Sequence, residues 1–194
     1  MNFFRFLLAI FILCSSFNLY AAGQRKHVII PKLGFYEMRN SHTGGYVFDT
    51  SSDSVYGFEY ERRFSMGLSI GVEHMHIENS ITSPSSESEL DVDILFFISR
   101  YYFNYDKSSH WRPFVGLGAG YGSGETRSYG AIDGQAYQAM AGITYEWDRM
   151  GMYLQYKRMY SKIDADSIGI LRYTGSPEFD ISGQGLFAGL IVKF

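Results

Sequence analysis

Two histidines and a glutamate, His74, His76 and Glu78, occupy every second position in one stretch of the chain. Side chains alternate between the two faces of a β-strand, so on a strand these three would lie together on one face. Two imidazoles and a carboxylate in that arrangement can bind a transition metal. The same alternation, however, places them in line with an apolar stripe at the end of a strand. We therefore interpret them as polar residues at a rim, and we predict no metal site and no cofactor.

A serine beside a histidine is the second candidate for chemistry, because a serine nucleophile needs a base. Ser41 precedes His42 in a stretch rich in Ser, Thr, Gly and Asp, which predicts a loop. Adjacency in a loop does not hold the two side chains in a fixed geometry. The glycine-rich run Gly116–Gly120 is not a nucleotide-binding loop either, since it lies within a predicted strand and no helix follows it. We predict no catalytic residue.

Seven charged residues form the third set, and they share the less apolar face of several predicted strands. They are Glu59, Glu61, Arg63, Glu73, Arg112, Glu146 and Lys157. Paired carboxylates can carry out acid–base chemistry, whereas mixed charges in an enclosed space satisfy one another through ion pairs and hydrogen bonds. The choice between these interpretations depends on what the strands enclose.

The composition of the 194-residue chain is that of a single β-rich domain. Aromatic residues make up 18%, with 16 Tyr and 16 Phe, and there are 21 Gly against 4 Pro. The net charge of −3, with both signs spread along the chain, argues against nucleic acid as a partner. Cys14 is the only cysteine, which excludes a disulfide scaffold. A lipoprotein signal at Cys14 is disfavoured, because Leu13 precedes it in place of a small residue.

Residues 1–22 are predicted to be a secretory signal peptide, which leaves residues 23–194 as the mature domain. Arg5 supplies a positively charged start and Phe6–Leu13 an apolar segment too short to span a membrane. The small residues that follow make a cleavage zone, and cleavage fits equally after Ala21, Ala22 or Gly23.

Eight alternating segments follow, the first of them irregular, with lengths suited to crossing an outer membrane as tilted strands. They are residues 28–38, 55–64, 67–77, 90–104, 111–121, 137–147, 152–160 and 184–194. Four connections are long, and these are Asn40–Asp53, Asn79–Glu89, Gly122–Gly134 and Ile163–Ser182. The other three are short. An even number of strands with long loops at one rim and short turns at the other is typical of an outer-membrane barrel.

The volume of a barrel decides which face of these strands is inside. An eight-stranded barrel has an interior just wide enough for side chains to fill, so a stripe of Phe, Tyr, Trp, Leu and Ile from every strand would overfill it. The opposite face, with many glycines and the seven charged residues, fits. We predict an all-β fold, an eight-stranded antiparallel transmembrane up-and-down β-barrel. Its apolar face points to lipid, and its charged residues form ion pairs that plug the lumen.

Two segments differ in how clearly the alternation assigns their outward face. The segment 90–104 is apolar on both faces in its middle, and a bulge would exchange those faces. Its predicted outward set is Val92, Ile94, Phe96, Ile98 and Tyr102. The terminal segment is clearer, and we expect it to close the barrel against the strand that begins near Val28. Its predicted outward set includes Leu186, Leu190, Val192 and Phe194.

Three stretches of this pattern resemble a known family. They are W-R-P-F-V-G-L-G-A-G-Y (Trp111–Tyr121), G-I-T-Y-E (Gly142–Glu146) and A-G-L-I-V-K-F (Ala188–Phe194). They are similar to the eight-stranded outer-membrane β-barrel superfamily, the OmpA/OmpX-like group of Gram-negative bacteria. The resemblance implies a location in the cell outer membrane, contact with its lipid and lipopolysaccharide, and recognition of the terminal Phe194 by the barrel-assembly machinery. The family's lipid A deacylases carry a His-x-Ser pair on one strand face, and this sequence has none.

The predicted function is that of a small monomeric outer-membrane barrel with a structural or surface-interaction role and no catalysis. Its long loops would contact a host or envelope ligand. Fold does not settle function, because the resembling family includes adhesins, structural anchors and lipid A-modifying enzymes. A lipid A-modifying enzyme of the deacylase or acyltransferase type therefore remains one alternative. A minor narrow pore through the lumen is the other.

Overall fold

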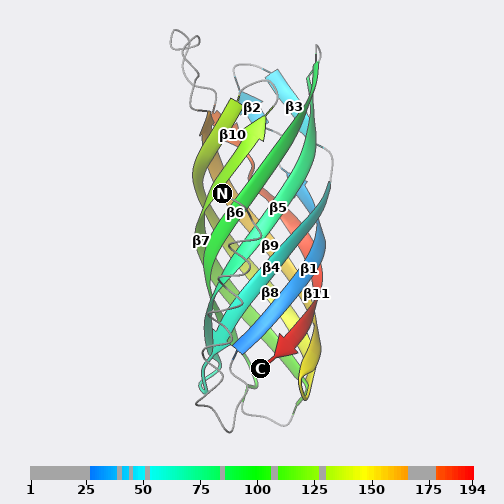
Figure 1. Cartoon of the computed structure of the whole chain (residues 1–194), viewed down its shortest axis with the longest axis vertical. Coiled ribbons are helices and arrows are strands. Elements are labelled where there is room, and N and C mark those ends of the chain that lie inside the picture. Colours follow the sequence, from blue (N-terminus) through cyan, green and yellow to red (C-terminus); the bar gives the residue numbers. More distant parts are fainter. Residues whose placement is uncertain are drawn as a thin grey trace.

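Eight long antiparallel strands close into a barrel in the computed structural model, which describes residues 27–38, 41–43, 46–50, 53–83, 86–105, 109–126, 130–165 and 178–194 (Figure 1). They are β1 (His27–Met38), β4 (Asp53–Arg63), β5 (Leu68–Ser83), β6 (Ser86–Tyr102), β7 (Trp111–Thr126), β8 (Gly130–Trp147), β9 (Met150–Ala165) and β11 (Gly183–Lys193). Each pairs with its neighbours along the chain, so the predicted all-β up-and-down barrel is confirmed. The predicted signal peptide, with Cys14, lies outside the described residues. No helix among the described residues is long and apolar enough to span a membrane.

The barrel closes between the first and last strands, as predicted. Val28 in β1 is the register partner of Lys193 in β11, and Met38 is the partner of Gly183. Two backbone hydrogen bonds continue this seam to the end of the chain, because the Phe194 amide donates to the His27 carbonyl at 3.0 Å and the His27 amide donates to the Phe194 carbonyl at 3.3 Å. β1 is a regular strand rather than an irregular one, since it pairs with β4 along its opposite edge.

Three further short strands lie at the rim opposite the C-terminus (Figure 1). They are β2 (Ser41–Thr43), β3 (Tyr46–Thr50) and β10 (Glu178–Asp180). β2 and β3 fall within the predicted loop Asn40–Asp53, and β10 within the predicted loop Ile163–Ser182. That rim carries the long connections, and we call it the long-loop rim. The opposite rim, with the tight turns, is the short-turn rim.

Two of the predicted long loops, Asn79–Glu89 and Gly122–Gly134, are wrong in extent, because much of their length continues the barrel strands. β5 and β6 stay paired through the predicted loop Asn79–Glu89, as far as Ser83 opposite Ser86. β7 and β8 likewise stay paired through most of Gly122–Gly134, as far as Thr126 opposite Gly130. Two strands that are already paired can add backbone hydrogen bonds without an apolar face, because the ladder uses main-chain groups. Polar composition therefore predicted loops where the ladder continues.

The predicted outward face of β6 is wrong as well. Val92, Ile94, Phe96, Ile98 and Tyr102 are buried inside the barrel, whereas Leu95, Phe97 and Tyr101 lie on the exterior. Arg100 explains the choice, because it shares the face of Ile98 and Tyr102 and its guanidinium reaches Glu59 inside. An arginine on the lipid face near the middle of the bilayer costs about 2–4 kcal/mol, so the ion pair selects the other face.

The six other strands for which an outward set was predicted face as predicted, and the exterior is apolar. Leu117, near the middle of β7, has 69% of its surface exposed. Aromatic side chains lie toward both ends of the exterior face: Trp111 and Trp147 toward the short-turn rim, Tyr121 and Tyr160 toward the long-loop rim. About ten residues separate Trp111 from Tyr121, which at the rise and tilt of barrel strands is roughly 25 Å, the height of the apolar band of an outer-membrane barrel.

Candidate functional site

The interior of the barrel holds the densest group of ionisable side chains. Six of the seven predicted lumen residues are buried there, namely Glu59, Glu61, Arg63, Glu73, Glu146 and Lys157. The seventh, Arg112, lies nearer the short-turn rim with 21% of its side chain exposed. The structure therefore gathers all seven in one lumen network. Three further members, Lys32, Arg100 and Lys193, were missed.

The centre of the lumen network joins three carboxylates to three cations. Arg100 donates to Glu59 from both terminal nitrogens: Nη1 to Oε1, and Nη2 to Oε2 at 2.7 Å. Its Nη1 also lies 3.3 Å from Glu61 Oε2. Lys32 Nζ donates to Glu59 Oε2 at 3.0 Å and also to Glu73. Lys157 donates to the same Glu73 oxygen, so each of these three carboxylates contacts at least one cation.

A second part of the lumen network lies closer to the short-turn rim, around Glu146. Arg63 Nη1 donates to Glu146 Oε1 at 2.6 Å, and its Nε donates to Glu61. Arg112 and Lys193 approach the other Glu146 oxygen at 3.5 and 3.4 Å. Three cations therefore surround one carboxylate at this end of the barrel.

Aromatic rings and hydroxyl groups complete the surroundings of the buried cations. The Arg100 guanidinium carbon lies 5.0 Å from the centroid of Phe114, and Lys157 Nζ lies 4.8 Å from that of Phe187. The Tyr102 hydroxyl donates to Glu61 at 2.9 Å, and Ser69 donates to the same carboxylate at 3.0 Å. Buried charges are stable only when such partners satisfy them. The ion pairs and hydrogen bonds of the lumen network therefore link different strands through the barrel interior.

The lumen becomes apolar toward the long-loop rim. Met75 and Ile77 of β5 and Ile94 of β6 are fully buried there. The remaining described side chains at this level include Met38, Val55, Val92, Met159 and Ile181, all buried. The interior thus has two layers, an ionic one in the half nearer the short turns and an apolar one above it. Buried side chains of the described residues occupy both layers.

Lys32 and Arg100 were missed because their strands gave weak signals. Lys32 shares its face with Val28 and Ile30, so that face looked apolar and the strand looked irregular. Arg100 follows a run that is apolar on both faces, which hid its direction. The predicted set held four carboxylates against three cations, so a balance of inward charges would have called for at least one further cation.

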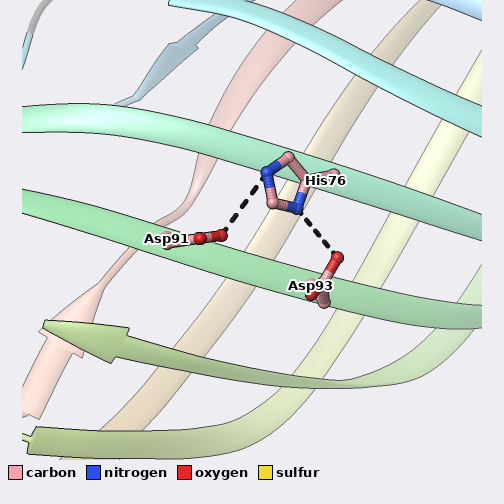
Figure 2. A group of neighbouring side chains, drawn as sticks. All are labelled: His76, Asp91 and Asp93. Atoms are coloured by element: carbon pink, nitrogen blue, oxygen red, sulfur yellow. Dashed lines mark hydrogen bonds and ion pairs between the residues drawn. The ribbon is translucent and has the colours of Figure 1, made fainter. Parts of the chain in front are cut away.

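The histidine cluster lies on the exterior of the barrel, where alternation placed it. The side chains of His74, His76 and Glu78 share the outward face of β5. Figure 2 shows His76 between Asp91 and Asp93 of β6, two carboxylates that the sequence interpretation had not connected with it. The other predicted pair, Ser41 and His42, lies in β2 rather than in a loop.

Comparison with known proteins identifies the fold. No family model and no curated protein matches the sequence. The outer membrane protein OprG from Pseudomonas aeruginosa has a TM-score of 0.64 and 13% identity, over 87% of this chain and 96% of its own. Neisserial surface protein A has a TM-score of 0.64 and 14% identity, over 87% of this chain and 97% of its own.

A third solved structure, AlkL in DMPC lipid bilayers, has a TM-score of 0.50 and 15% identity, over 92% of this chain and 95% of its own. At such identities the likeness shows the fold alone. That fold is the eight-stranded outer-membrane β-barrel, as the OmpA/OmpX-like resemblance implied. The fold and the apolar exterior agree with the predicted location in the cell outer membrane.

Proposed function

We propose that this protein is a closed, non-catalytic barrel of the outer membrane that works through its long-loop rim, as a surface-contact or envelope-stabilising protein. The observation that carries the proposal is the filled lumen. Glu59, Glu73 and Lys157 are fully buried in the middle of the barrel, and the Lys157–Glu73 pair joins β9 to β5 on the opposite side. A transport path through this point would have to break those ion pairs, which is strongly destabilising when one partner remains unpaired.

The length of the strands supports a role for the long-loop rim. β5 and β8 have 16 and 18 residues, whereas a strand crosses the outer membrane with about 9–11. The surplus of roughly six residues, at about 3.3 Å each along a tilted strand, carries the paired hairpins some 15 Å beyond the apolar band. Rigid hairpins of this kind present residues to a partner at a lower ordering cost than flexible loops do.

The partners follow from this placement. Outer-membrane lipid and lipopolysaccharide surround the apolar exterior, and a host or envelope ligand meets the hairpins. Phe194 is the signal read by the barrel-assembly machinery, and the folded protein is a monomer.

Two measurements test the proposal against its alternatives. Planar-bilayer recordings of the purified protein should show no discrete conductance. A stable unitary conductance would contradict the closed barrel and favour the narrow pore. Mass spectrometry of lipid A from cells with and without the protein should show the same acylation pattern. A change in that acylation pattern would contradict the non-catalytic role and favour the lipid A-modifying enzyme.

A third measurement separates surface contact from envelope support. Cells that express a variant with residues 80–89 replaced by a tight turn keep the membrane-spanning part of the barrel. Loss of adhesion to host cells or matrix, with unchanged sensitivity to detergent and chelator, indicates surface contact. Increased sensitivity with unchanged adhesion indicates envelope support, and no change in either, compared with cells lacking the protein, would contradict both.

A further inference from the structure

The pairing of β5 with β6 brings a histidine and two aspartates together on the exterior of the barrel. Asp93 is the register partner of His76, and Asp91 is the partner of Glu78, two residues further along. Directly paired residues of antiparallel strands have Cβ atoms about 4.5–5.5 Å apart, so their outward side chains meet. Asp93 also pairs with Ser123 of β7. Ser123 is two residues beyond Tyr121, one of the exterior aromatic residues toward the long-loop rim. The cluster therefore lies at the height of the lipid headgroups.

The donor atoms of this cluster lie close together. His76 Nδ1 lies 2.9 Å from Asp93 Oδ1, and His76 Nε2 lies 3.4 Å from Asp91 Oδ1 (Figure 2). One ligand atom from each of the three residues falls within 4.8 Å of the other two. Ligands of a tetrahedral zinc ion, each about 2.0–2.2 Å from the metal, lie roughly 3.3–3.5 Å apart. Asp93 meets Nδ1 and Asp91 meets Nε2, so a metal on Nδ1 would draw the exposed Asp91 carboxylate round to that side of the ring.

The surroundings prepare His76 for this role. The ring of Tyr56 packs on it with centroids 4.6 Å apart, and only 9% of His76 is exposed, so its position is fixed. The side chains of Asp91 and Asp93 are 62% and 52% exposed, which leaves room for water or a lipid phosphate as a further ligand. Glu78 Oε1 lies 3.1 Å from His76 Nε2, where it can orient the ring once Nδ1 binds a metal.

The charge of the cluster also calls for a cation. Three carboxylates, from Glu78, Asp91 and Asp93, face two imidazoles, and the outer-leaflet headgroups beside them are expected to be anionic. A divalent ion would neutralise part of this charge at the point where the β5–β6 hairpin leaves the membrane. His74 Nε2, 2.9 Å from Asp93 Oδ1, is close enough to join or to orient that ligand.

We propose that His76, Asp91 and Asp93 form a binding site for a divalent transition metal of the zinc class, which ties β5 to β6 at the outer-leaflet boundary. The imidazole sets the class of metal, because Ca²⁺ and Mg²⁺ prefer sets made only of oxygen ligands. The site does not depend on the function proposed above. The sequence alone did not indicate the contribution of β6 to this site. The aspartates stand about fifteen residues after the histidine, and only the register of β5 and β6 brings them next to it.

Calorimetric titration with ZnCl₂ tests the proposal, using the full barrel refolded in detergent without a polyhistidine tag. We expect one saturable site per barrel, with affinity reduced at least about tenfold in His76→Asn and in Asp93→Asn. His110→Asn and Asp148→Asn, at the short-turn rim, are matched controls that should bind as the wild type does. A heat-modifiable shift on gels shows that each variant is folded.

Three results would overturn the proposal. They are the absence of saturable Zn²⁺ binding, binding that survives both His76→Asn and Asp93→Asn, and displacement of Zn²⁺ by an equal concentration of Ca²⁺ or Mg²⁺. Co²⁺ provides an independent readout, since a histidine–carboxylate site should give visible absorption bands that disappear in His76→Asn and stay in His110→Asn.

Discussion

At the scale of single residues, the lumen depends on charges whose partners stand mostly on other strands, the Arg63–Glu61 pair within β4 being an exception. Arg100 of β6 reaches Glu59 of β4, and Lys157 of β9 reaches Glu73 of β5. Each fully buried carboxylate at the centre has a buried cation beside it. Such pairs add little when both partners can be replaced together, but removing one partner leaves an unpaired charge in a low-dielectric interior.

Removal of Arg100 tests this asymmetry. Arg100→Met leaves Glu59 with Lys32 alone, and we expect a loss of about 3 kcal/mol in the free energy of unfolding, measured by urea titration of tryptophan fluorescence in micelles. Arg149→Met, in the exposed turn between β8 and β9, is the control and should change stability by less than about 0.5 kcal/mol. The double variant Glu59→Met/Arg100→Met should recover part of the loss. Equal stability of Arg100→Met and Arg149→Met would contradict a bracing role.

Two buried glutamines offer an opposite pair of outcomes. Neither amide atom of Gln155 has a hydrogen-bond partner among the described residues, whereas Gln138 Nε2 donates to Glu73 at 2.7 Å. Gln155→Met should therefore raise the free energy of unfolding by about 1 kcal/mol, because it removes an unsatisfied buried amide. Gln138→Met should lower it by about 1–2 kcal/mol, because Glu73 loses a donor. The same unfolding titration measures both, and a loss of stability in both variants would show that Gln155 has a polar partner.

At the scale of elements, the short-turn rim is shaped by two residues with left-handed backbone. Gly67 has φ +84° in the turn between β4 and β5, and Asn104 has φ +59° after β6. The turn is closed by the Gly67 amide, which donates to the Phe64 carbonyl at 3.1 Å. L-residues other than Gly, Asn and Asp rarely adopt such angles, so these positions fix where the strands reverse.

Substitution of Gly67 should therefore be costly even though the turn is on the surface. A Cβ at this position would lie 2.6 Å from the Tyr102 carbonyl oxygen, in addition to the strained φ. We expect Gly67→Ala to lower the free energy of unfolding by about 1–2 kcal/mol. Ser65→Ala in the same turn is the control, with a change below about 0.5 kcal/mol. If the two variants unfolded at the same urea concentration, the turn would tolerate a side chain at position 67.

At the scale of the whole molecule, closure joins the first strand to the last and places Phe194 at the seam. Its ring stacks on His27 with centroids 5.9 Å apart, at the short-turn rim. We therefore propose two separable roles for Phe194, a contact that stabilises the folded barrel and the assembly signal implied by the family resemblance. The ring contact involves both residues equally, whereas the signal concerns Phe194 alone.

That difference allows a test of the assembly signal. Phe194→Ala should lower the amount of folded barrel in the outer membrane several-fold, measured by heat-modifiable migration of the protein in membrane fractions. His27→Ala removes the same ring contact and should leave that amount nearly unchanged. In refolding into detergent, where no assembly machinery is present, the two variants should behave alike. An equal defect of both variants in cells would assign the effect to the seam instead.

The alternation of side chains was readable from the sequence, because it is a local property with a period of two residues. It predicted eight strands, their order, the lipid-facing stripe of six of them, and the inward direction of Glu59, Glu73 and Lys157. Where both faces were apolar, as in residues 90–104, the local pattern carried no information. The direction of β6 was decided by Arg100, whose partner stands on another strand.

Pairings belong to two strands at once, so only the tertiary structure decided them. Register placed Asp91 and Asp93 beside His76, and it turned a weak pattern of alternate histidines into a candidate metal site. It also carried the hairpins through polar stretches that composition predicted to be loops, because the ladder depends on main-chain groups. The sequence by itself determined which side of each clear strand faces lipid. The assembled barrel determined which residues become neighbours on adjacent strands, since the register of one strand against the next is not encoded in either strand alone.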